Sequence, residues 1–177
     1  WRKKNNYAGF KSSYAARQHV IYAGGNDGML HAFNADIGEE MWGFVPPFIA
    51  AKLPLIVQRD LDGFVGAHDG GGTNPIFAVD GSPVIHDMYI HGLDFTTATK
   101  FEELKSWRTI LFIPYGRGGP GFSVLDVTEP LIKPSKGPMH MFSIFNDAIN
   151  NQVLVADHQG AITTHPYQIT SVNISNS

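Results

Sequence analysis

The chain has 177 residues, with 13 Lys and Arg against 16 Asp and Glu, a formal net charge of −3 and no cysteine. This length suits one domain or a large piece of one, and the balanced charge argues against nucleic acid as a partner. Without cysteine there is no disulfide framework or thiolate metal site, and no run of eighteen apolar residues predicts a transmembrane segment. Residues 1–18 begin without Met or an apolar run, so we expect a flanking segment inside a longer protein.

Short apolar runs separated by Gly, Asn, Asp and Pro recur along the chain and predict β-strands. In chain order, the expected strands are 19–23, 29–33, 41–45, 75–79, 83–90, 109–113, 122–125, 139–144 and 152–156. Helical periodicity is scarce, and only residues 101–107 resemble a helical turn. The sequence therefore predicts an all-β fold.

Two features indicate the blades of a β-propeller. Glycine-rich turns at residues 24–28 and 34–40 join the first three strands into a meander, which is most of one blade. Similar units begin near Ile21, Val65, Thr109 and Val153, at a spacing of about 44 residues, which is within the usual period of four-stranded blades. We therefore predict an arc of about four blades in a larger ring.

Three stretches carry a family resemblance. The first is residues 21–46, IYAGGNDGMLHAFNADIGEEMWGFVP; the second is DGSPVIHDMYI from Asp80, and the third is WRTILFIPYGRGGPGFSVLDVTEP from Trp107. In this order and spacing they resemble the C-terminal propeller, a quinoprotein-like propeller, of the PilC/PilY family of type IV pilus tip and biogenesis proteins. The resemblance covers residues 19–130. Residues 131–177 match the family pattern poorly, and we expect them to continue the propeller.

The resemblance implies a role outside the cell. It predicts a tip-associated adhesin and assembly factor that uses a rigid propeller for surface attachment and pilus biogenesis. The expected location is the cell surface, at the pilus tip or associated with the outer membrane, after export through the periplasm. The expected partners are minor pilins and a receptor on a host or abiotic surface. Calcium is the cofactor that the resemblance implies.

Residues 32–42, AFNADIGEEMW, also resemble the tryptophan-docking repeat of quinoprotein dehydrogenases. The repeat acts structurally in those proteins. By resemblance, Asn34 and Gly38 shape a turn, and the indole of Trp42 packs flat across an adjacent blade, where its N–H needs a partner.

Two further segments contain candidate site residues. Asp60, Asp62 and Gly63 begin the pattern of a calcium loop, but no third alternate ligand follows. A solvated acidic turn is thus the better interpretation, and the family's calcium loop is expected outside this segment. Residues 116–121 lack the Lys-Ser/Thr pair of a phosphate loop and are predicted to join two strands, with Arg117 at the tip facing a partner.

We expect no enzymatic activity and no bound quinone, because the sequence contains no nucleophile elbow, His-Glu-x-x-His motif or recognisable carboxylate pair. Two alternatives stay open. A quinoprotein-type dehydrogenase propeller predicts quinone and calcium in a central channel. A structural propeller of a surface fibre or virion appendage predicts stable assembly without pilus partners.

Overall fold

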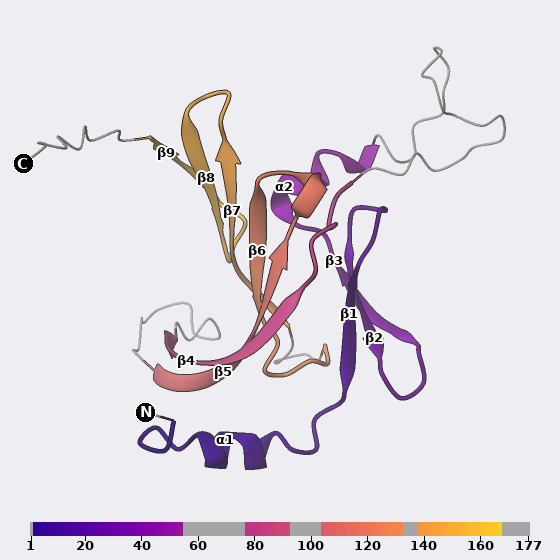
Figure 1. The fold of residues 1–177 in the computed structure, drawn as a ribbon, viewed down its shortest axis with the longest axis vertical. Helices are drawn as coiled ribbons and strands as arrows, with labels where there is room; N and C mark the ends of the chain where they lie inside the picture. The colour runs from indigo at the N-terminus through magenta and orange to yellow at the C-terminus, as the bar shows by residue number, and fades with distance from the viewer. Residues whose placement is uncertain (1, 55–76, 93–103, 133–137, 168–177) are drawn as a thin grey trace, which may run out of the picture.

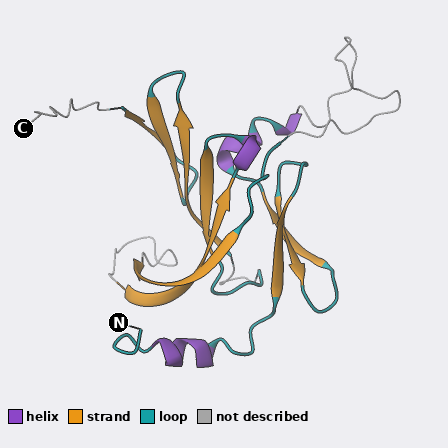
Figure 2. Cartoon of the chain, in the orientation of Figure 1, coloured by secondary structure: helices purple, strands orange, loops and turns teal. Residues whose placement is uncertain are grey.

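The computed structural model describes residues 2–54, 77–92, 104–132 and 138–167. Within these ranges the chain folds into two antiparallel sheets, one of three strands and one of six, with two short α-helices (Figures 1 and 2). The all-β prediction is therefore confirmed. No helix in the described ranges is both long enough and apolar enough to cross a membrane.

The first sheet is a meander of β1 (Val20–Gly24), β2 (Leu30–Asn34) and β3 (Glu40–Phe44). Each strand lies one residue from its predicted position. The turn between β2 and β3 requires Gly38, whose φ of 76° lies in the left-handed region that other residues rarely adopt. Asn34 supports this turn, because its side-chain oxygen accepts a hydrogen bond from the backbone N–H of Asp36 at 2.9 Å.

The second sheet runs from β4 to β9 in sequence order, with every strand antiparallel to the next. Its strands are β4 (Val84–Gly92), β5 (Leu104–Pro114), β6 (Gly121–Asp126), β7 (Met139–Asp147), β8 (Gln152–Asp157) and β9 (Ile162–Pro166). The 3-10 turn η1 (Gly116–Gly118) joins β5 to β6, so the connection predicted for residues 116–121 is confirmed. Residues 139–166, part of the segment expected to continue the propeller, extend this same sheet.

The inner face of the second sheet packs against the first sheet. Alternation along β5 shows this directly: Leu111 and Ile113 are 1% and 0% exposed, whereas Phe112 between them is 38% exposed. Apolar side chains from both sheets form one core, which consists of Leu30, Ala32, Trp42, Val79, Leu111, Ile113, Leu125 and Val127. Burial of this shared apolar surface holds the two sheets together.

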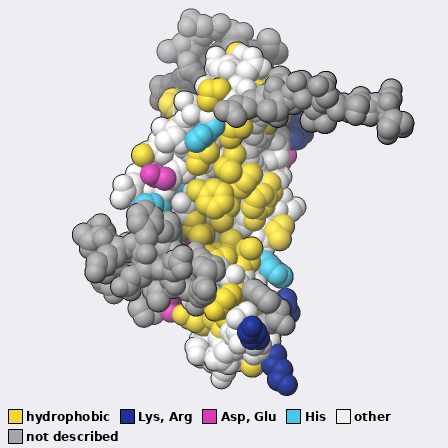
Figure 3. Space-filling model, turned by 90° about the vertical axis from the view of Figure 1, so that its left-hand side faces the viewer, with side chains coloured by type: hydrophobic (Ala, Val, Ile, Leu, Met, Phe, Trp, Pro, Cys, Tyr) yellow, Lys and Arg dark blue, Asp and Glu magenta, His cyan; other side chains and the backbone are white. Residues whose placement is uncertain are grey.

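The outer face of the second sheet is also apolar. Phe112 contacts Phe122 with ring centroids 4.5 Å apart, and Val84 and Met88 of β4 are largely exposed. Figure 3 shows hydrophobic side chains gathered along the middle of one face of the molecule. An exposed apolar face of this kind is typical of a sheet that packs against another sheet.

A row of hydroxyl groups crosses the buried face of the second sheet. The Tyr115 hydroxyl and Ser123 Oγ lie 2.7 Å apart, Ser123 Oγ and Ser143 Oγ lie 2.7 Å apart, and His140 Nε2 lies 2.8 Å from Ser143 Oγ. Burial lowers the pKa of His140, which favours the neutral ring. The row therefore satisfies polar groups in the core without a buried charge.

Trp42 links the two sheets. Its side chain is 8% exposed and packs within the shared core, 5.7 Å from the Tyr22 ring. The indole Nε1 donates a hydrogen bond of 2.8 Å to the carbonyl oxygen of Pro130, in the segment that follows β6. This bond joins β3 to a residue 88 positions farther along the chain.

Some sequence-based predictions were wrong. Residues 77–79 of the expected strand 75–79 are not a strand, and residues 104–107 of the expected helical turn belong to β5. In β5, pairing of Trp107 with Tyr89 of β4 overrides the local helical pattern. Helices α1 (Tyr7–Ser13) and α2 (Pro47–Ala50) and strand β9 were not expected. The repeat unit expected near Val65 lies outside the described residues.

We predict that Trp42→Phe lowers the free energy of unfolding by about 1–3 kcal/mol, because it leaves the buried Pro130 carbonyl without its donor. Chemical denaturation followed by circular dichroism measures the change. Tyr22→Phe is the matched control, since it removes a polar group from the neighbouring ring without breaking a hydrogen bond that the structure records. Equal stability of Trp42→Phe and wild type would contradict the prediction.

Candidate binding site

A cleft of about 540 Å³ lies between α1 and the β4–β5 hairpin. Its aromatic lining comes from Phe10 and Tyr14 on one side and from Tyr89 and Trp107 on the other. Its polar lining includes Asn6, Ser13, Ser106 and Arg108. The cleft is open to solvent over much of its extent and places aromatic and polar groups on one accessible surface.

Local sequence explains why α1 presents its rings to the cleft. Phe10 and Tyr14 are four residues apart, so they lie on one face of the helical segment, with ring centroids 5.0 Å apart. Asn6 caps the helix by accepting a 3.3 Å hydrogen bond from the Gly9 N–H. A Cβ at Gly9 would lie 2.4 Å from the Asn6 amide nitrogen, so glycine there allows this close approach.

Trp107 forms the floor of the cleft. It is 8% exposed, and its indole Nε1 donates a 2.7 Å hydrogen bond to the carbonyl oxygen of Asn5. Its ring lies 4.5 Å from Tyr7, 5.5 Å from Tyr89 and 6.2 Å from Phe10, measured between centroids. These contacts hold the aromatic rings in fixed relative positions.

Thr109 and Asp87 fasten the N-terminal segment to the second sheet. The Tyr7 hydroxyl donates to one Asp87 carboxylate oxygen at 2.7 Å, and the Thr109 hydroxyl donates to the other at 2.7 Å. Arg17 in turn donates to the Thr109 hydroxyl at 2.7 Å. The hydrogen bond to the carboxylate raises the pKa of Tyr7, and burial adds to that effect, so Tyr7 stays protonated and remains a donor.

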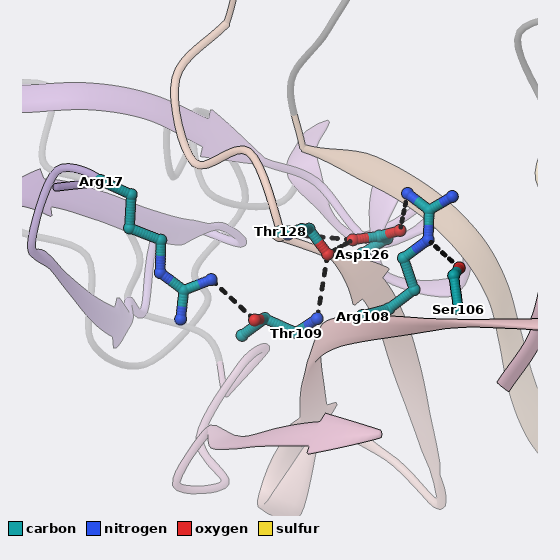
Figure 4. Close-up of polar contacts among 6 residues, drawn as sticks. All are labelled: Arg17, Ser106, Arg108, Thr109, Asp126 and Thr128. Atoms are coloured by element: carbon teal, nitrogen blue, oxygen red, sulfur yellow. Dashed lines mark hydrogen bonds and ion pairs between the residues drawn. The ribbon is translucent and has the colours of Figure 1, made fainter. Parts of the chain in front are cut away.

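The same threonine connects to the segment after β6 (Figure 4). The Thr109 N–H donates to the Thr128 hydroxyl at 2.9 Å, which donates to Asp126 at 2.6 Å. Asp126 also pairs with Arg108, whose Nη1 lies 3.4 Å from the carboxylate. Arg108 Nε donates to the Ser106 hydroxyl at 3.1 Å, and both residues are among those that line the cleft.

The surroundings of the cleft are cationic. Residues 2–17 contain no acidic residue and five cations, which are Arg2, Lys3, Lys4, Lys11 and Arg17. In Figure 3, Lys and Arg side chains gather at the lower end, and Figure 1 places α1 at that end. The nearby carboxylates of Asp87 and Asp126 already accept hydrogen bonds from protein groups.

The structure separates the site residues that the sequence predicted. Asn34, Gly38 and Trp42 lie in or beside the first sheet, and their role in docking blades stays a prediction. Arg117 lies in η1, where its guanidinium carbon is 3.7 Å from the centroid of the Phe77 ring. Contact of Arg117 with a partner also stays a prediction.

Calcium stays a prediction as well. Asp60 and Asp62 lie outside the described residues. The part of the chain that the structure describes contains no group of three or more His, Asp or Glu side chains able to hold a metal ion.

His31 on β2 belongs to a separate charged cluster. Its Nδ1 lies 2.7 Å from Glu40 Oε1, and its Nε2 lies 2.8 Å from Asp27 Oδ2. The hydrogen bond to Glu40 is the main reason why the pKa of His31 is raised. Both carboxylates belong to the first sheet and its turn, so this cluster ties the β1–β2 turn to β3.

Comparison with known proteins places the chain in a family. The family model described as the PilY1 beta-propeller domain matches residues 2–155. Since this match covers more than half of the residues, the chain belongs to the PilY1 β-propeller family. The match confirms the resemblance that the motifs in residues 19–130 indicate.

The individual relatives align with different fractions of this chain and of their own length. The type IV pilus biogenesis factor PilY1 of Pseudomonas aeruginosa PAO1 is 36% identical over 125 residues, which are 71% of this chain and 9% of that protein. The chain thus spans about a tenth of the length of this relative. The crystal structure of the P. aeruginosa PilY1 C-terminal domain matches with 23% identity and a TM-score of 0.47, covering 88% of this chain and 31% of that one. The quinoprotein ethanol dehydrogenase of Pseudomonas putida is 31% identical over 67 residues, 37% of this chain and 11% of that protein.

Sequence reasoning did not find the cleft, although a signal was present. Tyr7, Phe10 and Tyr14 follow helical spacing after the capping residue Asn6. Because these residues lie in the segment 1–18, which was expected only to flank the fold, the sequence predicted no binding role for them. The sequence could not predict that α1 packs against the β4–β5 hairpin, because the contacting residues Tyr7 and Asp87 are 80 positions apart.

We predict that Thr109→Val loosens the N-terminal segment, because Arg17 and Asp87 both lose a hydrogen-bond partner. Loss of these bonds to charged groups costs about 1–3 kcal/mol, so tryptic cleavage after Arg17 should become at least about fivefold faster. Timed proteolysis with mass spectrometry measures the rate.

Thr164→Val is the matched control for this experiment, because it makes the same change at an exposed position on β9. Equal cleavage rates in Thr109→Val and wild type would show that Thr109 does not hold the segment.

Proposed function

We propose that this chain is part of a type IV pilus adhesin and assembly factor. Its propeller is displayed outside the cell at the pilus tip and attaches to a host or abiotic surface through the aromatic cleft. The proposal draws on membership of the PilY1 β-propeller family and on a relative named as a pilus biogenesis factor. The observation that carries the attachment role is the cleft itself.

Rigidity makes this cleft suitable for attachment. Phe10 and Tyr14 are fixed on α1, and α1 is fastened to the sheet through Tyr7 and Arg17. Aromatic side chains that are already ordered lose little conformational entropy when a ligand binds. Such an arrangement retains more of its binding energy than rings on an unrestrained segment would.

Assembly requires a second surface, and η1 is our candidate for it. Arg117 is exposed in η1, beyond the end of β5 that lies away from the cleft. Trp107 and Pro114 are seven positions apart on β5, or roughly 23 Å at the rise of a strand. We propose that this end contacts minor pilins while the cleft remains free for the surface receptor.

Variants of the two cleft rings test the attachment role. In cells that express the whole protein, Phe10→Ala combined with Tyr14→Ala should reduce attachment under flow severalfold while the number of pili stays at the wild-type level. The reason is that the variant removes ligand contacts and leaves Asp87, Thr109 and Arg17 in place. Electron microscopy counts pili, and microscopy in a flow cell counts attached cells.

Tyr167→Ala is the matched control, since it removes a partly exposed aromatic ring just beyond β9. Unchanged attachment in the double variant would contradict the proposed role of the cleft. Loss of pili in the double variant, but not in the control, would assign these rings to assembly and also overturn the attachment role.

A further inference from the structure

We propose that the ligand of the aromatic cleft is an acidic saccharide, an oligosaccharide whose sugar rings carry carboxylate groups. This inference rests on the proposed attachment function and names the class of ligand that the site takes. Three properties of the cleft support it: its aromatic surfaces, its unused hydrogen-bonding groups and its charge.

The aromatic surfaces suit the faces of sugar rings. Phe10, Tyr14 and Tyr89 are half-buried, so each ring has one part packed in the protein and another part open to the cleft. A pyranose ring has an apolar face of C–H groups, whose partial positive charge matches the negative face of an aromatic ring. Because these rings come from both walls, a saccharide in the cleft meets an aromatic surface on each side.

The polar groups suit sugar hydroxyls. Asn6 uses its side-chain oxygen to cap α1, while its amide nitrogen makes no hydrogen bond with the described residues. Ser13 and Tyr14 line the cleft, and their hydroxyls likewise have no hydrogen-bond partner within the described ranges. Amides and hydroxyls that both donate and accept can match the ring hydroxyls of a sugar.

The charge suits a carboxylate. Arg108 uses Nε for Ser106 and Nη1 for Asp126, which leaves Nη2 without a partner among the described residues. A guanidinium N–H binds a carboxylate through a charge-assisted hydrogen bond. The exposed cations Lys3, Lys4 and Lys11 add a favourable field around the same site.

The volume of the cleft favours a short oligosaccharide over a long polymer, which would need an extended groove. A volume of about 540 Å³ falls within the range of small-molecule sites. Single-stranded nucleic acid would need a continuous groove of cations that follows its phosphates. The cleft lining includes one such cation, Arg108.

Isothermal titration calorimetry of the whole protein with trigalacturonate tests the inference. The methyl ester of the same trisaccharide is the matched ligand, since it keeps the rings and hydroxyls but removes the charges. We expect trigalacturonate to bind at least tenfold more tightly than the ester, and we expect this advantage to shrink as salt concentration rises. Equal affinity for the two ligands, or no binding of either, would overturn the inference.

Two protein variants locate the binding. Arg108→Gln should weaken trigalacturonate binding at least tenfold, whereas Arg117→Gln, the same change at the far end of β5, should leave it unchanged. Because Arg108 also pairs with the buried Asp126, Tyr14→Leu provides a second variant that spares this pair and should also weaken binding. Wild-type affinity in Tyr14→Leu and in a folded Arg108→Gln protein would overturn the assignment to this cleft.

Other ligands, together with the attachment assay, distinguish failure of the saccharide inference from failure of the proposed attachment role. Tighter binding of oligothymidylate or of a polyglutamate peptide, again sensitive to Tyr14→Leu, would replace the saccharide with that class of ligand. If the Phe10 and Tyr14 variant loses attachment but trigalacturonate does not bind, the attachment role stands and the saccharide inference fails. If trigalacturonate binds as expected and attachment is unchanged, the attachment role fails instead.

Discussion

The position of the N-terminal segment, and with it the cleft, depends most on the two hydrogen bonds made by the hydroxyl of Thr109. This hydroxyl donates to Asp87 of β4. It also accepts a hydrogen bond from Arg17 of the N-terminal segment, and the backbone N–H of Thr109 donates to Thr128 (Figure 4). Thr109 is 2% exposed, so these bonds are shielded from competition with water. One buried residue thus joins β4 and β5, the segment after β6 and, through Arg17, the N-terminal segment that contains α1.

Two kinds of interaction have different roles in the fold. Burial of apolar side chains between the sheets gives most of the stability. Trp42 belongs to this core, and its indole N–H donates a hydrogen bond to the Pro130 carbonyl. Directional polar bonds then set the position of α1, which buries few apolar groups of its own. The core therefore explains why the sheets form, and the polar bonds explain where the cleft lies.

The sequence allowed much of the fold to be predicted, because strands and turns depend on local patterns. The meander from β1 to β3 follows from alternating residues and from Gly38, whose left-handed conformation can be inferred from the turn composition. The unbroken six-stranded sheet and the cleft could not be predicted in the same way. Both depend on pairings between distant residues, such as Tyr7 with Asp87, that no local pattern specifies.

The central claim is that residues 7–17 are held against β4 and β5 and so form one wall of the binding cleft. Hydrogen–deuterium exchange of the whole protein, read by mass spectrometry, tests it most directly. The account predicts slow exchange of peptides covering residues 7–17 in the wild type and fast exchange in Asp87→Ala, with exchange in β7 and β8 unchanged. Exchange of residues 7–17 at the rate of an unfolded chain in the wild type would contradict it.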